Sequence, residues 1–190
     1  MLSSTTGRNR TTFKPTDGHD HFSIEITSIT APQKQFTTHI LAGVDHIFYV
    51  VPLCSYCSML EDTLSRNLME VCLELFSSMT RLEVLRDTQI TIFFTQADIF
   101  PQRIVDVPIH DWFQEFRGGA DAHAAYQYFV DQFLVRDNRE DAQVHMFAPG
   151  LDGLTSLQDT LDKLQILILW SLRSRQQIAG SLGTEIGWAQ

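Results

Sequence analysis

The fold of this chain is decided by the stretch Ile47-Phe-Tyr-Val-Val-Pro-Leu53. A near-continuous apolar run this short is typical of a strand in a parallel sheet that is covered on both faces. Downstream, apolar residues recur at steps of three and four over residues 64–79, which predicts an amphipathic helix capped by Asp62. Residues 89–94 are rich in β-branched and aromatic side chains and predict the next strand. A strand, a helix and a second strand in this order indicate a parallel crossover and an α/β protein.

The same alternation continues to both sides of this core. Residues 22–26 alternate apolar and polar side chains, as a half-buried strand does, whereas the first twenty residues are predicted to be loop. Residues 98–119 are predicted to be irregular because Pro101 and Pro108 interrupt them. Beyond them, the sequence predicts helices over 122–134 and 157–168, a strand over 144–148 and a flexible tail over 174–190. We therefore predict one α/β domain with three layers and a mostly parallel sheet.

Composition excludes several classes of function. The chain has 190 residues, 44% of them hydrophobic, which is enough for a packed core. Its formal charge of −9 argues against a basic surface that would attract nucleic-acid backbones. The longest apolar run, residues 164–172, falls short of the roughly 20 residues of a membrane span, and the polar start lacks a signal-peptide core. Three cysteines favour a reducing compartment, so we expect a cytoplasmic location.

Asp98 is the first candidate functional residue. It follows the strand predicted over 89–94, and ligands of parallel sheets bind at loops beyond the carboxyl ends of the strands. An Asp here can accept hydrogen bonds from the ring N–H and amino group of a purine, or it can cap a turn. The sequence contains no G-x-x-x-x-G-K-[ST] phosphate loop and no G-x-G-x-x-G or G-x-S-x-G motif.

Two further motifs have low specificity. Cys54-Ser-Tyr-Cys57 has the spacing of a redox-active thiol pair, but the two thiols can also be unrelated, and no second pair completes a zinc site. His19-Asp20-His21 could hold a metal ion weakly or belong to a solvated loop.

Several stretches together resemble a known family. Val107-Pro-Ile-His-Asp-Trp-Phe-Gln-Glu-Phe-Arg-Gly-Gly-Ala-Asp121 is similar to V-P-L-x-x-[YF]-F-P-E-[YF]-x-G-G-A-D of heterotrimeric G-protein α subunits. Gly43-Val-Asp-His-Ile-Phe-Tyr-Val-Val-Pro-Leu-Cys-Ser-Tyr56 is similar to that family's G-V-x-x-I-I-F-x-V-x-L-S-x-Y, and residues 124–133 to its A-A-x-[YF]-I-x-x-x-F helix. The resemblance covers roughly residues 5–172, the C-terminal part of the Ras-like GTPase domain.

The resemblance implies a receptor-coupled signalling protein that binds guanine nucleotide. It implies a partial P-loop GTPase fold over 21–173, with 1–20 as a disordered or switch-one-like remnant. GTP or GDP and magnesium are the implied cofactors, with Asp98 contacting the base and Thr5 matching the magnesium-ligating threonine. The implied partners are βγ subunits and receptor or effector proteins, which would bring the chain to the inner face of the plasma membrane.

The departures from the family pattern predict loss of catalysis. The first strand, the P-loop and the helical insert domain have no counterpart, and Leu2 stands where the switch-one arginine is expected. Ile26-Thr-Ser-Ile-Thr30 aligns with D-V-G-G-Q, and Thr95-Gln-Ala-Asp98 with N-K-x-D. Phe147-Ala-Pro-Gly150 aligns with T-C-A-[TV], where Pro149 has no N–H to donate. We predict no significant GTP hydrolysis and weak or no GTP binding. The alternatives are a non-catalytic pseudo-GTPase interaction module and a truncated or decayed gene product.

The missing strand also bears on the sheet. In the family, the P-loop strand lies between the strands that match residues 22–26 and 47–53. Without it, either these two strands pair, or the sheet splits, or the sequence is a fragment of a longer protein. Each buried backbone group left without a partner would cost about 1–3 kcal/mol.

Overall fold

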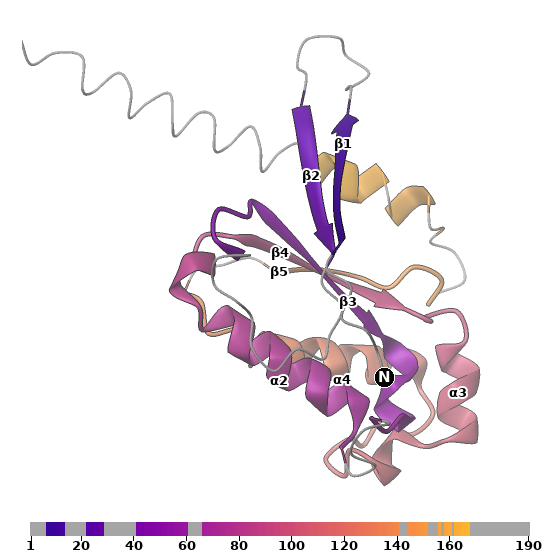
Figure 1. Ribbon diagram of the computed structural model, residues 1–190. Coiled ribbons are helices and arrows are strands. Elements are labelled where there is room, and N and C mark those ends of the chain that lie inside the picture. Colours follow the sequence, from indigo (N-terminus) through magenta and orange to yellow (C-terminus); the bar gives the residue numbers. More distant parts are fainter. Residues whose placement is uncertain are drawn as a thin grey trace, which may run out of the picture. The chain divides into compact units, whose positions relative to one another are not determined.

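The computed structural model describes residues 7–13, 22–28, 41–60, 66–140, 144–151, 156, 158–160 and 162–167 (Figure 1). The chain forms two compact units, residues 1–40 and residues 41–190. The domain boundaries expected at residues 20 and 173 are not tested by this division and stay predictions.

The first unit contains a β-hairpin of two antiparallel strands. Strand β1 spans Gly7–Phe13 and strand β2 spans Phe22–Ser28, with Gly7 opposite Ser28 and Phe13 opposite Phe22. The strand predicted over 22–26 is confirmed, whereas the prediction of loop is wrong for residues 7–13. The sequence of β1 lacks the alternation of apolar and polar residues by which a strand is recognised. Its extended form comes from the antiparallel ladder with β2, which its own side chains do not encode.

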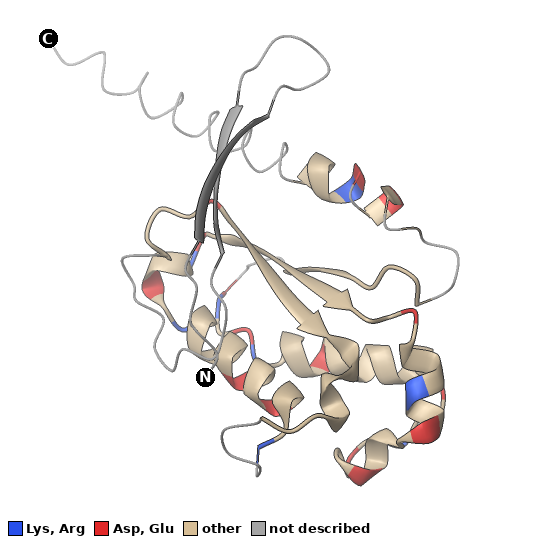
Figure 2. Cartoon of the chain, turned by 45° about the vertical axis from the view of Figure 1, so that its right-hand side comes forward, with Lys and Arg blue, Asp and Glu red and all other residues tan. Residues whose placement is uncertain are grey.

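The second unit is built on a parallel sheet of three strands in the order β3-β4-β5 (Figure 1). Their bounds are His46–Pro52 for β3, Gln89–Thr95 for β4 and Val144–Phe147 for β5. Ile47 lies opposite Ile90, and Ile90 opposite Val144. None of the three strands carries a charged residue, as Figure 2 shows. The strands predicted over 47–53, 89–94 and 144–148 are confirmed, and with them the α/β class and the parallel sheet.

Of the alternatives for the missing strand, the pairing of residues 22–26 with 47–53 is not formed among the described strands, and the fragment alternative stays a prediction. Strands β1 and β2 form one sheet and β3, β4 and β5 form another. Among the described strands, β3 pairs with β4 alone and is therefore the edge of its sheet.

Helix α2 spans Leu68–Thr80 and begins later than predicted. Its N-cap is Asn67, whose side-chain oxygen accepts hydrogen bonds from the backbone N–H of Met69 at 2.9 Å and of Glu70 at 3.3 Å. Asn67 thus satisfies two of the N–H groups that an α-helix leaves unpaired at its start. The predicted cap, Asp62, lies outside the described residues.

Helix α3, Phe100–Asp106, lies inside the region that was predicted to be irregular, and that prediction is wrong there. Pro101 stands in the first turn of α3, where a backbone N–H would have no helical partner. It starts this helix instead of breaking it. Pro108 does follow the end of α3, before a short 3-10 turn at Ile109–Asp111.

Helix α4 spans Ala122–Leu134, as predicted, and Asp121 caps it. Residues 158–160 and 162–167 are helical, in agreement with the predicted third helix, and Thr160 and Leu164 are buried.

An aromatic cluster joins one face of the sheet to α2 and α4, which lie side by side in Figure 1. Tyr49 of β3 lies 5.6 Å, between ring centroids, from Phe76 of α2 and 6.2 Å from Phe133 of α4. Phe94 of β4 lies 5.7 Å from Phe133. Phe76, Phe94 and Phe133 are fully buried. Edge-to-face pairs of this kind add about 0.5–1.5 kcal/mol each beyond the area that they bury.

The other face of β3 is exposed among the described residues. Phe48 is 43% exposed and Val50 59% exposed. Within the described part of the chain, the prediction that this strand is covered on both faces is therefore wrong. A continuous apolar run indicates only that both faces of a strand can be buried. Whether another layer covers both faces depends on the rest of the fold.

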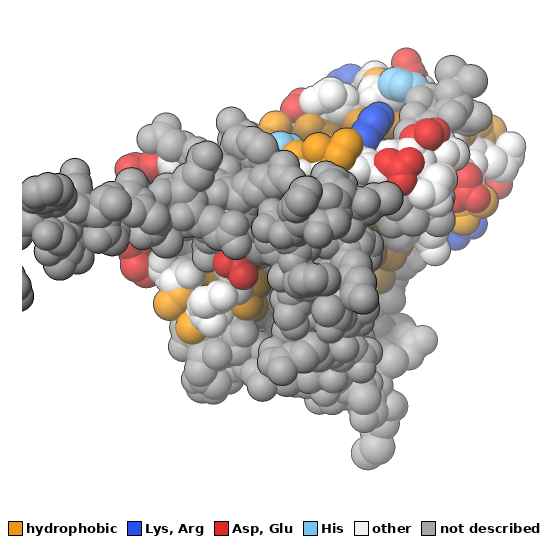
Figure 3. All heavy atoms as spheres, turned by 90° about the horizontal axis from the view of Figure 1, so that it is seen from above, with side chains coloured by type: hydrophobic (Ala, Val, Ile, Leu, Met, Phe, Trp, Pro, Cys, Tyr) orange, Lys and Arg blue, Asp and Glu red, His pale blue; other side chains and the backbone are white. Residues whose placement is uncertain are grey.

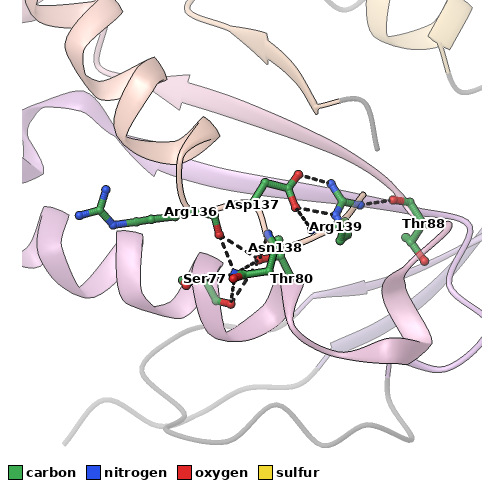
Figure 4. Close-up of polar contacts among 7 residues, drawn as sticks. All are labelled: Ser77, Thr80, Thr88, Arg136, Asp137, Asn138 and Arg139. Atoms are coloured by element: carbon green, nitrogen blue, oxygen red, sulfur yellow. Dashed lines mark hydrogen bonds and ion pairs between the residues drawn. The ribbon is translucent and has the colours of Figure 1, made fainter. Parts of the chain in front are cut away.

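A polar network holds the loop that leads from α4 toward β5 (Figure 4). The guanidinium of Arg139 donates to both carboxylate oxygens of Asp137, at 2.9 and 2.8 Å, and to the carbonyl oxygen of Thr88 at 2.5 Å. The side chains of Arg139 and Asp137 are only 1% and 9% exposed. Next to them, the amide of Asn138 donates to the hydroxyl of Thr80 at 3.1 Å. The network ties the amino end of β4 to the residues before β5.

Candidate functional site

The loops after β4 and β5 meet at the carboxyl end of the sheet. A Cβ atom built on Gly150 would lie 3.2 Å from the Cβ atom of Asp98, so the two loops are in van der Waals contact there. Gly150 has a φ of +87°, which favours glycine. We call Thr95–Asp98 and Phe147–Gly150 the base edge. The structure therefore brings together the two segments that the sequence predicted to face a nucleotide base.

Asp98 is exposed at the base edge. Within the described part of the chain, its carboxylate accepts no hydrogen bond and forms no ion pair, and the start of α3 has no side-chain cap. The alternative role, a turn cap, is therefore not what this side chain does among these residues. Its carboxylate is free to accept hydrogen bonds from a ring N–H and an amino group.

The backbone before Asp98 is tightly constrained. Gln96 has a φ of +60°, an uncommon conformation for a residue other than glycine. Its carbonyl oxygen accepts a weak hydrogen bond from the thiol of Cys54 at 3.8 Å, and Ala97 is buried. Gln96 stands where the resemblance places a lysine. The base edge therefore has a constrained loop but lacks the positive charge of that lysine.

The second loop offers few hydrogen-bond donors. Pro149 lacks an N–H, and the N–H of Leu151 is turned inward to the carbonyl oxygen of Ala148 at 3.3 Å. At the base edge, Asp98 can therefore accept hydrogen bonds, while position 149 cannot donate one. It contains no lysine or arginine.

A nucleic-acid ligand would also need basic residues on the surface around the sheet. On the face drawn in Figure 3, acidic side chains are spread among isolated basic ones. A basic patch of the kind that binds nucleic-acid backbones is not visible there.

Other predicted site residues lie outside the described residues. These are Thr5, Leu2 and the His19-Asp20-His21 motif, and the magnesium role of Thr5 stays a prediction. Among the residues that are described, no group of three or more His, Cys, Asp or Glu side chains could hold a metal ion. In the same residues, no helix is both long and apolar enough to cross a membrane.

A cavity of about 280 Å³ lies at the opposite end of the sheet from the base edge. Charged and polar side chains from the loops after α2 and α4 line most of it: Thr80, Arg81, Glu83, Arg86, Asn138, Arg139 and Glu140. It contains no base-edge residue and takes no part in the candidate site.

Comparison with known proteins decides the family. The family model described as G-protein alpha subunit matches residues 2–163. The chain belongs to the G-protein α-subunit family. With this assignment, the three-stranded parallel sheet and its helices are part of a Ras-like GTPase fold, as the sequence motifs implied.

Relatives within the family are similar at modest identity. The chain is 29% identical over 139 residues to the guanine nucleotide-binding protein alpha-1 subunit of Mycosarcoma maydis, covering 73% of this chain and 38% of the relative. It is 25% identical over 131 residues to the G(o) subunit alpha of Caenorhabditis elegans, covering 69% and 37%. A guanine nucleotide-binding protein subunit alpha of Cryptococcus neoformans is 30% identical over 107 residues, covering 56% and 24%. The matches thus span less than two fifths of the length of these relatives.

Proposed function

We propose that this chain is a signalling protein of the G-protein α type that acts through partner proteins and does not hydrolyse GTP. The observation that supports this most is the base edge, where Asp98 lies against Gly150, but Gln96 replaces the expected lysine and Pro149 replaces a residue with a backbone N–H. A surface without the lysine and without this backbone N–H is less suited to holding a nucleotide base than to contact with another protein.

By the family resemblance, guanine nucleotide would contact Asp98 and magnesium would contact Thr5, and we expect both contacts to be weak or absent in this chain. Most of the affinity of P-loop GTPases for nucleotide comes from backbone N–H groups and a lysine around the phosphates, together with Mg²⁺. The sequence of these 190 residues has no such motif. One carboxylate at the base edge cannot replace several charge-assisted contacts to phosphate, so nucleotide binding is expected to be weak or absent.

βγ subunits and receptor or effector proteins are the proposed partners, at the cytoplasmic face of the plasma membrane. Exposed apolar side chains on and around α3 support a protein-binding role. Ile99 is 52% exposed, Val105 60% and Trp112 36%. Large apolar residues of this kind are used at protein interfaces, where tryptophan in particular is enriched.

A titration of the chain with a fluorescent GTP analogue and magnesium tests the nucleotide part of the proposal. We expect no saturable binding at micromolar concentrations, and Asp98→Ala should give the same trace as the unchanged chain. Micromolar or tighter binding that Asp98→Ala abolishes would overturn the loss of nucleotide binding. A pull-down with purified βγ subunits tests the signalling part, and absence of binding there would favour the pseudo-GTPase module with other partners.

A further inference from the structure

Two cysteines lie three residues apart directly after β3. Cys54 and Cys57 lie on one short 3-10 helix, Leu53–Cys57. In a 3-10 helix, side chains three residues apart are eclipsed, and a rise of about 2 Å per residue separates their Cα atoms by about 6 Å. That separation falls in the range of disulfide bonds, about 4.4–6.8 Å. The Cys57 sulfur already lies 3.3 Å from the carbonyl oxygen of Cys54.

The two thiols have different surroundings. Cys54 is 9% exposed, and burial, with a further contribution from Cys57, raises its pKa. Cys57 is half-buried, and the guanidinium of Arg103 on α3 donates a hydrogen bond to its sulfur at 3.3 Å. The hydrogen bond from Arg103 holds the more accessible of the two sulfurs in place, and the thiolate is the nucleophilic form of cysteine.

The segment between the thiols is firmly held. The side chain of Tyr56 is fully buried, and its hydroxyl lies within hydrogen-bonding distance of the carbonyl oxygens of Val107, at 2.5 Å, and Arg103, at 3.1 Å. The amide of Asn67 donates to the carbonyl oxygen of Tyr56. These contacts keep the 3-10 helix and the start of α3 together, so that Arg103 stays beside Cys57.

We propose that Cys54 and Cys57 form a redox-sensitive thiol pair that hydrogen peroxide converts to an intrachain disulfide. The Cys57 thiolate attacks one peroxide oxygen; an S–O bond forms, the O–O bond breaks, and the departing hydroxide takes up a proton to leave as water. The Cys54 sulfur then attacks the oxidised Cys57 sulfur. The S–S bond forms, the S–O bond breaks, and the hydroxyl leaves as water with the Cys54 proton. Overall, two thiols are oxidised to one disulfide and one peroxide is reduced to two waters.

The disulfide would act on the neighbouring base edge. The Cys54 thiol donates to the carbonyl oxygen of Gln96, which precedes Asp98 by two residues. A disulfide sulfur has no proton to donate, so oxidation removes this link between the two loops. The proposal does not depend on nucleotide binding.

The test is oxidation of the full chain with hydrogen peroxide, followed by alkylation and peptide mass spectrometry. We expect a product lighter by two hydrogens, located in the peptide that holds Cys54 and Cys57 and reversed by a reductant. Cys72 should stay reduced, because burial raises its pKa to about 11. Oxidation of Cys72 as fast as of Cys57, or wild-type chain that stops at sulfenic or sulfinic acid, would overturn the proposal.

Variants separate the roles of the groups. Cys54→Ser should accumulate a sulfenic acid at Cys57 that dimedone traps, whereas Cys57→Ser should form neither product. Cys72→Ser is the matched control and should form the disulfide at the wild-type rate. Arg103→Gln should slow oxidation several-fold with an unchanged circular dichroism spectrum, and Arg86→Gln should not. Equal rates for Arg103→Gln and wild type would contradict the role of the guanidinium.

Discussion

The two ends of the three-stranded sheet use their polar groups differently. At the amino end, the buried side chains of Asp137 and Arg139 satisfy each other and the carbonyl oxygen of Thr88. At the carboxyl end, Asp98 is exposed and has no partner among the described residues, and Pro149 offers no N–H. The amino end buries paired charges, while the carboxyl end presents the polar side chains of Gln96 and Asp98 to solvent.

The largest expected effect comes from breaking the amino end. Arg139→Met leaves the carboxylate of Asp137 buried and unpaired and removes the donor to Thr88. We expect unfolding free energy to fall by about 3–5 kcal/mol, measured by urea denaturation. Arg86→Met is the control, because its ion pairs with Glu83 and Glu140 are exposed, and it should cost less than about 1 kcal/mol. Equal losses in both variants would refute the importance of burial.

The next effect is a pH dependence, also near the amino end. His46 has a buried Nδ1 without a hydrogen-bond partner, and burial, then His145, lowers its pKa from 6.5 to about 4. Between these values the unfolded chain binds more protons than the folded chain, so stability is full above about pH 6.5 and is lost as pH falls toward 4. After allowance for partial solvent access, we expect a loss of about 1–2 kcal/mol.

Urea denaturation at several pH values measures this loss. His46→Gln, which can keep the hydrogen bond to Thr91, should flatten the curve between pH 6.5 and 4. His123→Gln, at an exposed position, is the control and should leave the curve unchanged. A wild-type curve with the same slope as that of His46→Gln would show that His46 does not titrate in this way.

At the carboxyl end, Gly150→Ala probes how tightly the base-edge loops are packed. The variant combines a φ of +87° with a new Cβ atom 3.2 Å from Asp98, and we expect a loss of about 1–2 kcal/mol. Gly43→Ala shares a positive φ but meets no atom within 4 Å, so it isolates the cost of the backbone conformation. If the two variants lose the same stability by thermal unfolding, contact with Asp98 contributes nothing.

The smallest effect is expected for Asp98→Ala, because its side chain is exposed and has no partner in the described residues. We expect a change below about 0.5 kcal/mol in unfolding free energy. Asp121→Ala is the matched control, since Asp121 accepts hydrogen bonds from the N–H groups of His123 and Ala124 and caps α4. It should cost about 1 kcal/mol. A larger loss for Asp98→Ala would mean that the base edge depends on this carboxylate for its structure.

Local pattern predicted the elements whose residues carry their own signal. Strand β4 was predicted closely because it is rich in β-branched residues, and helix α4 because its apolar residues recur at helical spacing. Strand β1 was missed because its pairing with β2, not its side-chain pattern, makes it extended. Helix α3 was missed because a proline usually interrupts a helix, and the sequence does not show that Pro101 lies in the first turn.

The candidate site divides in the same way. Asp98 and the Cys54–Cys57 spacing could be found in the sequence, since each follows a predicted strand. Arg103 could not be assigned to Cys57, because it lies 46 residues away along the chain. Asp137 and Arg139 are only two positions apart in the sequence, yet the local sequence does not indicate that both side chains are buried.

By itself, the sequence determined the α/β class, the family resemblance and the replaced nucleotide motifs, because these depend on residue type and order. Only the tertiary structure decided that β2 pairs with β1, that one face of β3 is exposed among the described residues and that Asp98 lies against Gly150. Burial and contact between distant residues follow from how layers pack, and a local pattern records only what each segment is able to bury.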